Sequence, residues 1–89
     1  MAARFQLILS PAFRRDMERL PPLVHGQVVE ALQILETVPK GPHPKVKKLK
    51  GKAAGLWRLE VWPYRIRYDV VGREVHLHRV RDRKEIYRD

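Results

Sequence analysis

Three short segments in the second half of the chain alternate between apolar and polar residues, and this pattern limits the fold more than any other feature. Successive side chains of a β-strand point to opposite faces, so each segment predicts a strand with one buried and one solvated face. The predicted strands cover residues 56–62, 64–70 and 74–80. Pro63 separates the first two, and Gly72 marks the second turn, where it can adopt a positive φ. The pattern therefore predicts a three-stranded antiparallel meander.

The first 39 residues predict one strand and two helices. Residues 5–9 alternate weakly and indicate a strand. Ser10 is expected to cap a helix that begins at Pro11 and ends near residue 20, where Pro21-Pro22 interrupts it. A second helix is expected up to about residue 38. Its apolar positions recur at steps of three and four and form one stripe: Val24, Val28, Ala31, Leu32, Leu35 and Val38. The short break between the helices predicts an antiparallel helical hairpin.

These elements predict an α+β fold in one domain over residues 1–89. An N-terminal strand and a helical hairpin are followed by the meander, which completes one sheet. The chain has no cysteine, which excludes a disulfide framework and any thiolate zinc site. The longest uncharged run, residues 20–29, is too short to span a bilayer. The first residues lack the apolar core of a signal peptide, so we expect a cytoplasmic protein without membrane contact.

The positive charge lies entirely in the second half of the chain. Residues 1–39 carry four Arg and four Asp or Glu, whereas residues 40–89 carry 15 Lys and Arg against six Asp and Glu, which gives the net charge of +9. A one-sided excess of this kind indicates a surface that binds a polyanion, although a solvated face without a partner is the alternative. The side chains that we expect to contact the phosphate backbone of such a polyanion are Lys45, Lys47, Lys48, Lys50, Lys52 and Arg67.

The polar face of the predicted meander is unusual in its composition. It carries Arg58, Arg65 and Arg67 together with His76 and His78, where a solvated sheet face usually mixes Thr, Ser, Lys and Glu. Arginine binds phosphate in a planar, bidentate manner that lysine cannot reproduce. A basic sheet face bordered by the lysine run of residues 45–52 therefore predicts binding to a phosphate backbone. The aromatic residues Trp57, Tyr64 and Tyr68 are expected in the core.

Four stretches of the chain resemble the RelE/ParE toxin superfamily. They are KLKG at residues 48–51, GLWRL at 55–59, YRIRY at 64–68 and VRDRKEIY at 80–87. Their order and spacing match the family pattern, and the predicted order of strand, two helices and meander matches as well. The resemblance implies a RelE-like fold and the toxin of a type II toxin–antitoxin pair.

The resemblance also implies an activity. RelE-like members cut mRNA in the ribosomal A site by attack of a ribose 2′-hydroxyl on the adjacent phosphate, which leaves a 2′,3′-cyclic phosphate, and they use no metal or cofactor. ParE-like members share the fold but inhibit DNA gyrase, so the fold leaves both activities open. A third alternative is a basic RNA-binding module without catalysis. The implied partners are a cognate antitoxin in a hetero-oligomer, the ribosome and mRNA.

The resemblance assigns roles to five residues of this chain. Lys50 stands where RelE-like members have a phosphate-binding arginine, and Arg58 matches the first of two strand lysines that handle protons and stabilise charge. Arg65 and Arg83 match arginines of the Y-R motif and of the C-terminal motif, and with Arg58 they would hold the scissile phosphate. Tyr87 matches the closing tyrosine, which would contact the substrate nucleotide or anchor the tail.

Two residues depart from the family pattern and bear on the choice of a general base. Glu60 occupies the position of the second strand lysine, and Asp82 stands where many relatives have histidine. Arginine is a poor proton acceptor at neutral pH, so the base must be another group. His43, in a Pro-His-Pro sequence that resembles the Pro-Glu-Pro of YoeB-like relatives, is the first candidate. Glu60 is the second, and a carboxylate flanked by arginines is a weaker base.

The two strand histidines are further candidates for proton transfer. His76 and His78 lie on the same predicted face and each is also consistent with a passive polar residue. As a zinc pair they lack further convincing ligands, so we expect no metal site.

Overall fold

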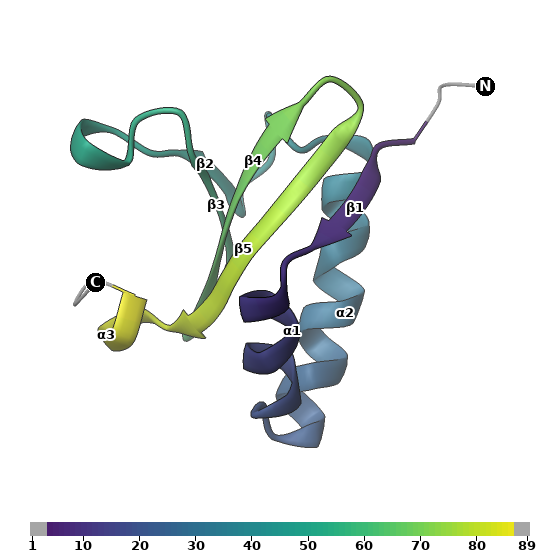
Figure 1. Ribbon diagram of the computed structural model, residues 1–89, viewed down its shortest axis with the longest axis vertical. Coiled ribbons are helices and arrows are strands. Elements are labelled where there is room, and N and C mark those ends of the chain that lie inside the picture. Colours follow the sequence, from purple (N-terminus) through teal and green to yellow (C-terminus); the bar gives the residue numbers. More distant parts are fainter. Residues whose placement is uncertain (1–3, 87–89) are drawn as a thin grey trace.

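Residues 4–86 are described by the computed structural model, in which the apolar faces predicted above meet between one sheet and two helices (Figure 1). The elements in chain order are β1 (Gln6–Leu9), α1 (Pro11–Glu18), α2 (Pro22–Thr37), β2 (Val46–Lys48), the 3-10 helix η1 (Gly51–Ala53), β3 (Trp57–Val61), β4 (Tyr64–Val71), β5 (Glu74–Asp82) and α3 (Arg83–Ile86). The strand order in the sheet is β1-β5-β4-β3-β2. β1 runs parallel to β5, and the other neighbours are antiparallel.

The helical hairpin begins and turns where the sequence predicts. The Ser10 hydroxyl accepts a hydrogen bond from the Phe13 backbone N–H at 3.1 Å, which is the expected N-cap of α1. The same hydroxyl donates to the His78 carbonyl oxygen at 3.1 Å and so joins the start of α1 to the sheet. α2 begins at Pro22, directly after Pro21. The two helices lie side by side against one face of the sheet (Figure 1). No helix within residues 4–86 is long and apolar enough to cross a membrane.

The core forms between this helical layer and the apolar face of the sheet. Its fully buried side chains come from both layers: Phe13, Val28, Leu35, Leu59, Ile66, Tyr68, Val75 and Leu77. The Tyr68 hydroxyl donates a hydrogen bond to the Pro39 carbonyl oxygen and fixes the loop after α2 against the sheet. Burial raises the pKa of Tyr68, because the phenolate would be poorly solvated there. The predicted core position of Tyr68 is confirmed, and Trp57 and Tyr64 are partly buried against the same core.

The sheet contains one strand that the alternation pattern does not reveal. β2 is three residues long and pairs with β3 at the sheet edge, with Val46 opposite Leu59. Val46 is 8% exposed and belongs to the core, whereas Lys47 and Lys48 are exposed. Within a run of lysines, one buried valine is too weak a signal to predict a strand. The sheet therefore has five strands instead of the expected four, within the same α+β fold.

A β-bulge in β5 changes which of its residues face the core. Arg67 pairs with Arg79 but its neighbour Tyr68 pairs with Leu77, so His78 is an extra residue in β5. The bulge explains why Leu77 and Val80, three residues apart, are both buried. β5 also extends two residues beyond its predicted end, to Asp82.

The bulge lies where β1 ends and α1 takes its place beside β5. The Asp16 carboxylate accepts hydrogen bonds from the Val80 backbone N–H at 3.1 Å and from Arg79 Nε and Nη2 at 2.8 and 3.0 Å. Burial raises the pKa of Asp16, but these hydrogen bonds and the charges of Arg79 and Arg81 outweigh it, so the pKa lies below its ordinary value. Asp16 of α1 thus accepts a hydrogen bond from the backbone of β5 beyond the point where β1 pairs with that strand.

Candidate functional site

Two arginines and a glutamate form the centre of the candidate site on the polar face of the sheet. Strand register places Glu60 of β3 directly opposite Arg65 of β4. Glu60 Oε1 lies 3.1 Å from Arg58 Nη2 and 3.7 Å from Arg65 Nη2. The side chains of Arg58 and Arg65 are only 19% and 11% exposed. The structure therefore brings together three of the residues that the sequence singled out. Together with Arg83, whose charge acts on Arg65, we call them the arginine cluster.

Among the described residues, two arginines and one glutamate act on the guanidinium of Arg65. Burial lowers the pKa of Arg65, the charges of Arg58 and Arg83 lower it further, and the charge of Glu60 raises it. The guanidinium stays protonated at neutral pH all the same, because its ordinary pKa is so high. A phosphate bound beside these cations would gain charge-assisted hydrogen bonds.

Arg83 joins the cluster from the chain segment that follows β5. Its backbone N–H donates to the Pro63 carbonyl oxygen at 2.9 Å, which fixes the start of α3 against the turn between β3 and β4. Its guanidinium carbon lies 5.1 Å from the centroid of the Trp62 ring. Tyr87, the last residue assigned by family resemblance, lies outside the described residues.

Strand register extends the basic surface across four strands. Lys47 of β2 is opposite Arg58, Arg58 is opposite Arg67, and Arg67 is opposite Arg79 of β5. We call these four residues the basic row. Arg67 is partly buried within it, and Arg79 is held by its two hydrogen bonds to Asp16.

Arg81 is a candidate that the sequence analysis did not single out. It lies directly opposite Arg65 across β4 and β5, and therefore on the face of the arginine cluster. Strict alternation from Val75 and Leu77 would assign Arg79 and Arg81 to the core face, and the bulge reverses this assignment. Val80 is the sequence signal that could have identified Arg81. A valine between two arginines can face the core only if the alternation of β5 shifts by one residue before it, and Val80 is buried.

The three predicted histidines have hydrogen-bond partners outside the cluster. His43 is in the loop before β2, where its Nδ1 accepts a hydrogen bond from the Lys45 backbone N–H at 3.1 Å. Its hydrogen bond thus links it to its own loop rather than to Arg58 or Arg65. His76 is 3.1 Å from Glu74, and His78 is 3.2 Å from Asp69. Among the side chains that the structure describes, no three from His, Asp or Glu lie close enough together to hold a metal ion.

The predicted lysines lie at the edge of the sheet that β2 forms. All of them are exposed, on β2, in the segments that flank it and in η1: Lys45, Lys47, Lys48, Lys50 and Lys52. Lys50 immediately precedes η1, which begins at Gly51 with a φ of 69°. This positive φ is one that a residue other than glycine rarely adopts.

Comparison with known proteins places the chain in a family. The family model described as the ParE toxin of the type II toxin–antitoxin system parDE matches residues 7–87. The chain belongs to this toxin family. No curated protein sequence matches the toxin significantly.

Solved structures of toxins have the same fold. The toxin is 28% identical to a chain of the RelBE2 toxin–antitoxin complex from Mycobacterium tuberculosis, with a TM-score of 0.78 over 90% of this chain and 99% of that one. A chain of the RelB–RelE antitoxin–toxin complex from Methanococcus jannaschii is 23% identical, with a TM-score of 0.74 over 91% and 95% of the two chains. A YoeB/ParE toxin from Agrobacterium tumefaciens is 20% identical, with a TM-score of 0.74 over 86% and 97%. The predicted RelE-like fold is thereby confirmed.

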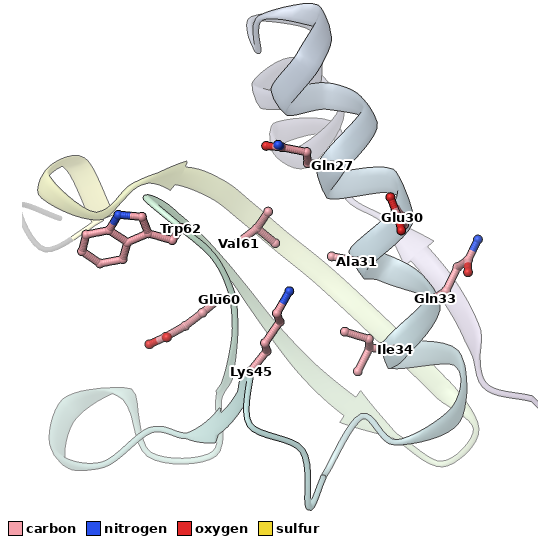
Figure 2. Close-up of a pocket in the computed structure, with 9 residues that line it drawn as sticks. All are labelled: Gln27, Glu30, Ala31, Gln33, Ile34, Lys45, Glu60, Val61 and Trp62. Atoms are coloured by element: carbon pink, nitrogen blue, oxygen red, sulfur yellow. The ribbon is translucent and has the colours of Figure 1, made fainter.

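A pocket of about 630 Å³ borders the arginine cluster of the toxin, between α2 and the edge of the sheet (Figure 2). Figure 2 shows the Lys45 side chain rising between the strand and α2, while the side chains of Glu60 and Trp62 project away from α2. The lining residues are Gln27, Glu30, Ala31, Gln33, Ile34, Lys45, Glu60, Val61 and Trp62. Glu60 and Trp62 thus form the rim that the pocket shares with the polar face of the sheet.

Proposed function

We propose that this toxin is a ribosome-dependent mRNA endonuclease that cleaves by attack of a ribose 2′-hydroxyl on the adjacent phosphate. The observation that carries the proposal is the arginine cluster, in which Arg58 and Arg65 contact Glu60 and the charge of Arg83 acts on Arg65. A scissile phosphate bound there would gain charge-assisted hydrogen bonds from planar guanidinium groups. Their positive charge would also stabilise the additional negative charge that develops on the phosphorane during attack.

The reaction needs no group beyond RNA, protein side chains and water. The 2′-oxygen forms a bond to phosphorus, and the bond between phosphorus and the 5′-oxygen breaks. A base takes the proton of the 2′-hydroxyl, and the departing 5′-oxygen takes a proton from water. The products are a 2′,3′-cyclic phosphate and a 5′-hydroxyl end.

Position favours Glu60 over His43 as the base. Glu60 lies within 3.7 Å of two guanidinium groups that would hold the phosphate, so its carboxylate is close to the expected position of the 2′-hydroxyl. The Nδ1 of His43 is engaged by the backbone of Lys45. In this proposal Glu60 replaces the lysine of the family pattern, and the surrounding arginines supply the positive charge that the lysine would have carried.

The basic row and the lysines would hold the rest of the message. An RNA backbone that crosses the sheet from β2 to β5 would meet Lys47, Arg58 and Arg67 in succession. The exposed lysines of residues 45–52 extend this surface at the edge of the sheet, where contact with ribosomal RNA is expected as well. The proposal places the activity in the cytoplasm, on translating ribosomes, and treats residues 1–89 as one toxin domain.

The proposed protein partner is a cognate antitoxin in a hetero-oligomeric complex. Two of the similar solved structures are toxin–antitoxin complexes, which supports such a partner here. A segment that neutralises the net charge of +9 would be acidic or amphipathic, and it would cover the arginine cluster.

Primer extension on message from programmed ribosomes tests the proposed nuclease. We expect cuts in register with the A-site codon from the native toxin. The double variant Arg65→Gln/Arg83→Gln should lose about 10²-fold or more of the cleavage rate, since each arginine contacts the developing charge. The double variant Arg14→Gln/Arg15→Gln removes the same charge from the exposed surface of α1 and should keep the activity. Growth arrest with intact message would contradict the proposal.

Gyrase inhibition is the second candidate function, because the matching family model is described by the parDE system. It predicts inhibited DNA supercoiling by purified gyrase and double-strand breaks in cells, with no codon-dependent cuts in mRNA. Salt-dependent RNA binding without cleavage and without an effect on gyrase would instead identify a non-catalytic RNA-binding module.

A further inference from the structure

Trp62 is an exposed aromatic side chain in the turn between β3 and β4. It is 67% exposed, and within residues 4–86 the other exposed large hydrophobic side chains are aliphatic: Leu23, Val29 and Val71. Tryptophan is highly buried on average, and its indole is enriched at binding interfaces because it offers a large apolar surface with one polar group. The proposed phosphate chemistry does not use it.

Trp62 lies on the same face as the arginine cluster. The alternation along β3 places Arg58 and Glu60 on the polar face, and Trp62 follows directly after Val61, the last residue of the strand. Figure 2 shows the indole and the Glu60 carboxylate both projecting away from α2. Two residues of chain span at most about 7 Å, so Trp62 lies roughly one nucleotide or less along the chain from Glu60 at the proposed phosphate position.

Arg83 fixes the indole in place. Its guanidinium lies over the Trp62 ring at 5.1 Å from the centroid, and its backbone N–H is hydrogen-bonded to Pro63 in the same turn. One face of the indole is therefore occupied by a cation, and the 67% exposure leaves room on the other face. An aromatic ring beside a guanidinium plane is the combination on which unpaired nucleobases stack.

We propose that Trp62, held by Arg83, is a stacking subsite for an unpaired nucleobase of the RNA strand whose phosphate binds at Arg58 and Arg65. This subsite rests on the proposed function, because it requires that single-stranded RNA occupies the arginine cluster. Stacking there would fix the nucleotide next to the scissile phosphate. Trp62 is thus a positioning residue for the cleaved strand, and its contact is with the base rather than with the reacting atoms.

Tryptophan fluorescence provides a direct readout. The toxin has two tryptophans, and the variant Trp62→Phe retains an aromatic ring while it removes the Trp62 emission. The probe is a short RNA with 2′-O-methyl riboses, which cannot be cut, and its control is an oligomer of the same length with abasic sugars. We expect the RNA to quench the native toxin strongly, the abasic oligomer to quench it weakly, and Trp62→Phe to respond weakly to both.

Affinity measurements then separate stacking from charge. Trp62→Ala should bind the RNA about 5- to 100-fold more weakly, with the salt dependence of binding unchanged because no phosphate contact is lost. Trp62→Phe should recover most of the affinity. Leu23→Ala, which removes an equally exposed apolar side chain from α2, should bind as the native toxin does. Circular dichroism at increasing temperature verifies that each variant is folded.

The outcomes distinguish this inference from the function on which it rests. RNA that is bound and cut equally well by Trp62→Ala overturns the stacking subsite and leaves the nuclease intact. If an antitoxin quenches the Trp62 fluorescence and RNA does not, the stacking subsite is overturned as well. Trp62 is then identified as a contact for the antitoxin. A native toxin that neither binds RNA nor cuts message on ribosomes overturns the proposed function and the subsite together.

Discussion

Glu60 and Arg65 face each other on neighbouring antiparallel strands, with Oε1 of the glutamate 3.7 Å from Nη2 of the arginine. The same oxygen is 3.1 Å from Arg58, so one carboxylate is shared by two guanidinium groups. In the free toxin this carboxylate reduces the repulsion between the arginines. In the proposed reaction it is the proton acceptor once a phosphate is bound.

Replacement of Glu60 by glutamine should therefore have opposite effects on binding and on chemistry. Uncleavable RNA should bind Glu60→Gln more tightly, because a negative charge next to the phosphate is removed. The single-turnover cleavage rate should fall by about 10²- to 10⁴-fold, which is the usual contribution of a general base. Glu18→Gln, an exposed change on α1, is the control for loss of one negative charge.

The variant His43→Asn completes this comparison. It should retain nearly the native cleavage rate, since the His43 ring is bound to its own loop. A Glu60→Gln variant that cleaves normally, together with an inactive His43→Asn, would assign the base to His43 and leave Glu60 as a counter-ion.

The basic row predicts a specific change in salt dependence. Lys47 lies opposite Arg58, and its contact with an RNA phosphate would release about 0.7 of a counter-ion. Lys47→Gln should lower the slope of log affinity against log salt concentration by about that amount for every RNA sequence. Fluorescence anisotropy in a KCl titration measures this slope. Lys40→Gln, in the exposed loop after α2, should leave it unchanged.

The Asp16 carboxylate should make the fold sensitive to acid. Its pKa in the folded protein lies below its ordinary value, so its stabilising effect is complete above the unfolded pKa near 4 and is lost as the pH falls toward the folded pKa. Asp16→Asn should cost about 1.5 to 3 kcal/mol at pH 7, the usual contribution of a charged hydrogen-bond partner. Urea unfolding from pH 7 to pH 3 should show the variant losing less stability than the native toxin. Parallel curves for the two proteins would contradict this assignment.

The buried Tyr68 hydroxyl should have the opposite pH dependence. Because its pKa is raised on folding, its contribution is complete below the unfolded pKa near 10 and is lost as the pH rises toward the folded pKa. Tyr68→Phe should lower the unfolding free energy by about 1 to 2 kcal/mol at pH 7, since the Pro39 carbonyl loses its donor. Unfolding curves at pH 7 and above pH 10 measure both effects, and the variant should lose less stability at high pH.

The first turn of α1 and the two faces of β3 and β4 were predictable from short-range pattern. Ser10 and Pro11 are a local capping signal, and the alternation of Trp57 to Val61 and of Tyr64 to Val70 follows from the pleat of a strand. The same pattern predicted that Arg58, Glu60 and Arg65 share a face. Tyr87 lies outside the described residues, so its assigned role stays a prediction.

The bulge at His78 and the pairing of β2 could not be predicted in this way. Whether β5 skips one residue depends on the end of β1 and on Asp16, which reaches the strand edge from a helix more than 60 positions earlier in the chain. That skip decides on which face Arg79 and Arg81 lie. The three residues of β2 likewise form a strand only through their pairing with β3, which lies later in the chain.

Residue order alone thus specified the helical hairpin, four of the five strands, the apolar faces of β3 and β4, the basic second half and the family to which the chain belongs. These features follow from periodicity, caps and motifs over a few neighbours. Distances between charges could not be obtained from it. Strand register sets the shared contact of Glu60 with two arginines and the position of Arg81. The hydrogen bond between the start of α3 and the turn after β3 places Arg83 over Trp62. Only the packed sheet, which aligns residues far apart in the chain to within a few ångströms, sets these relationships.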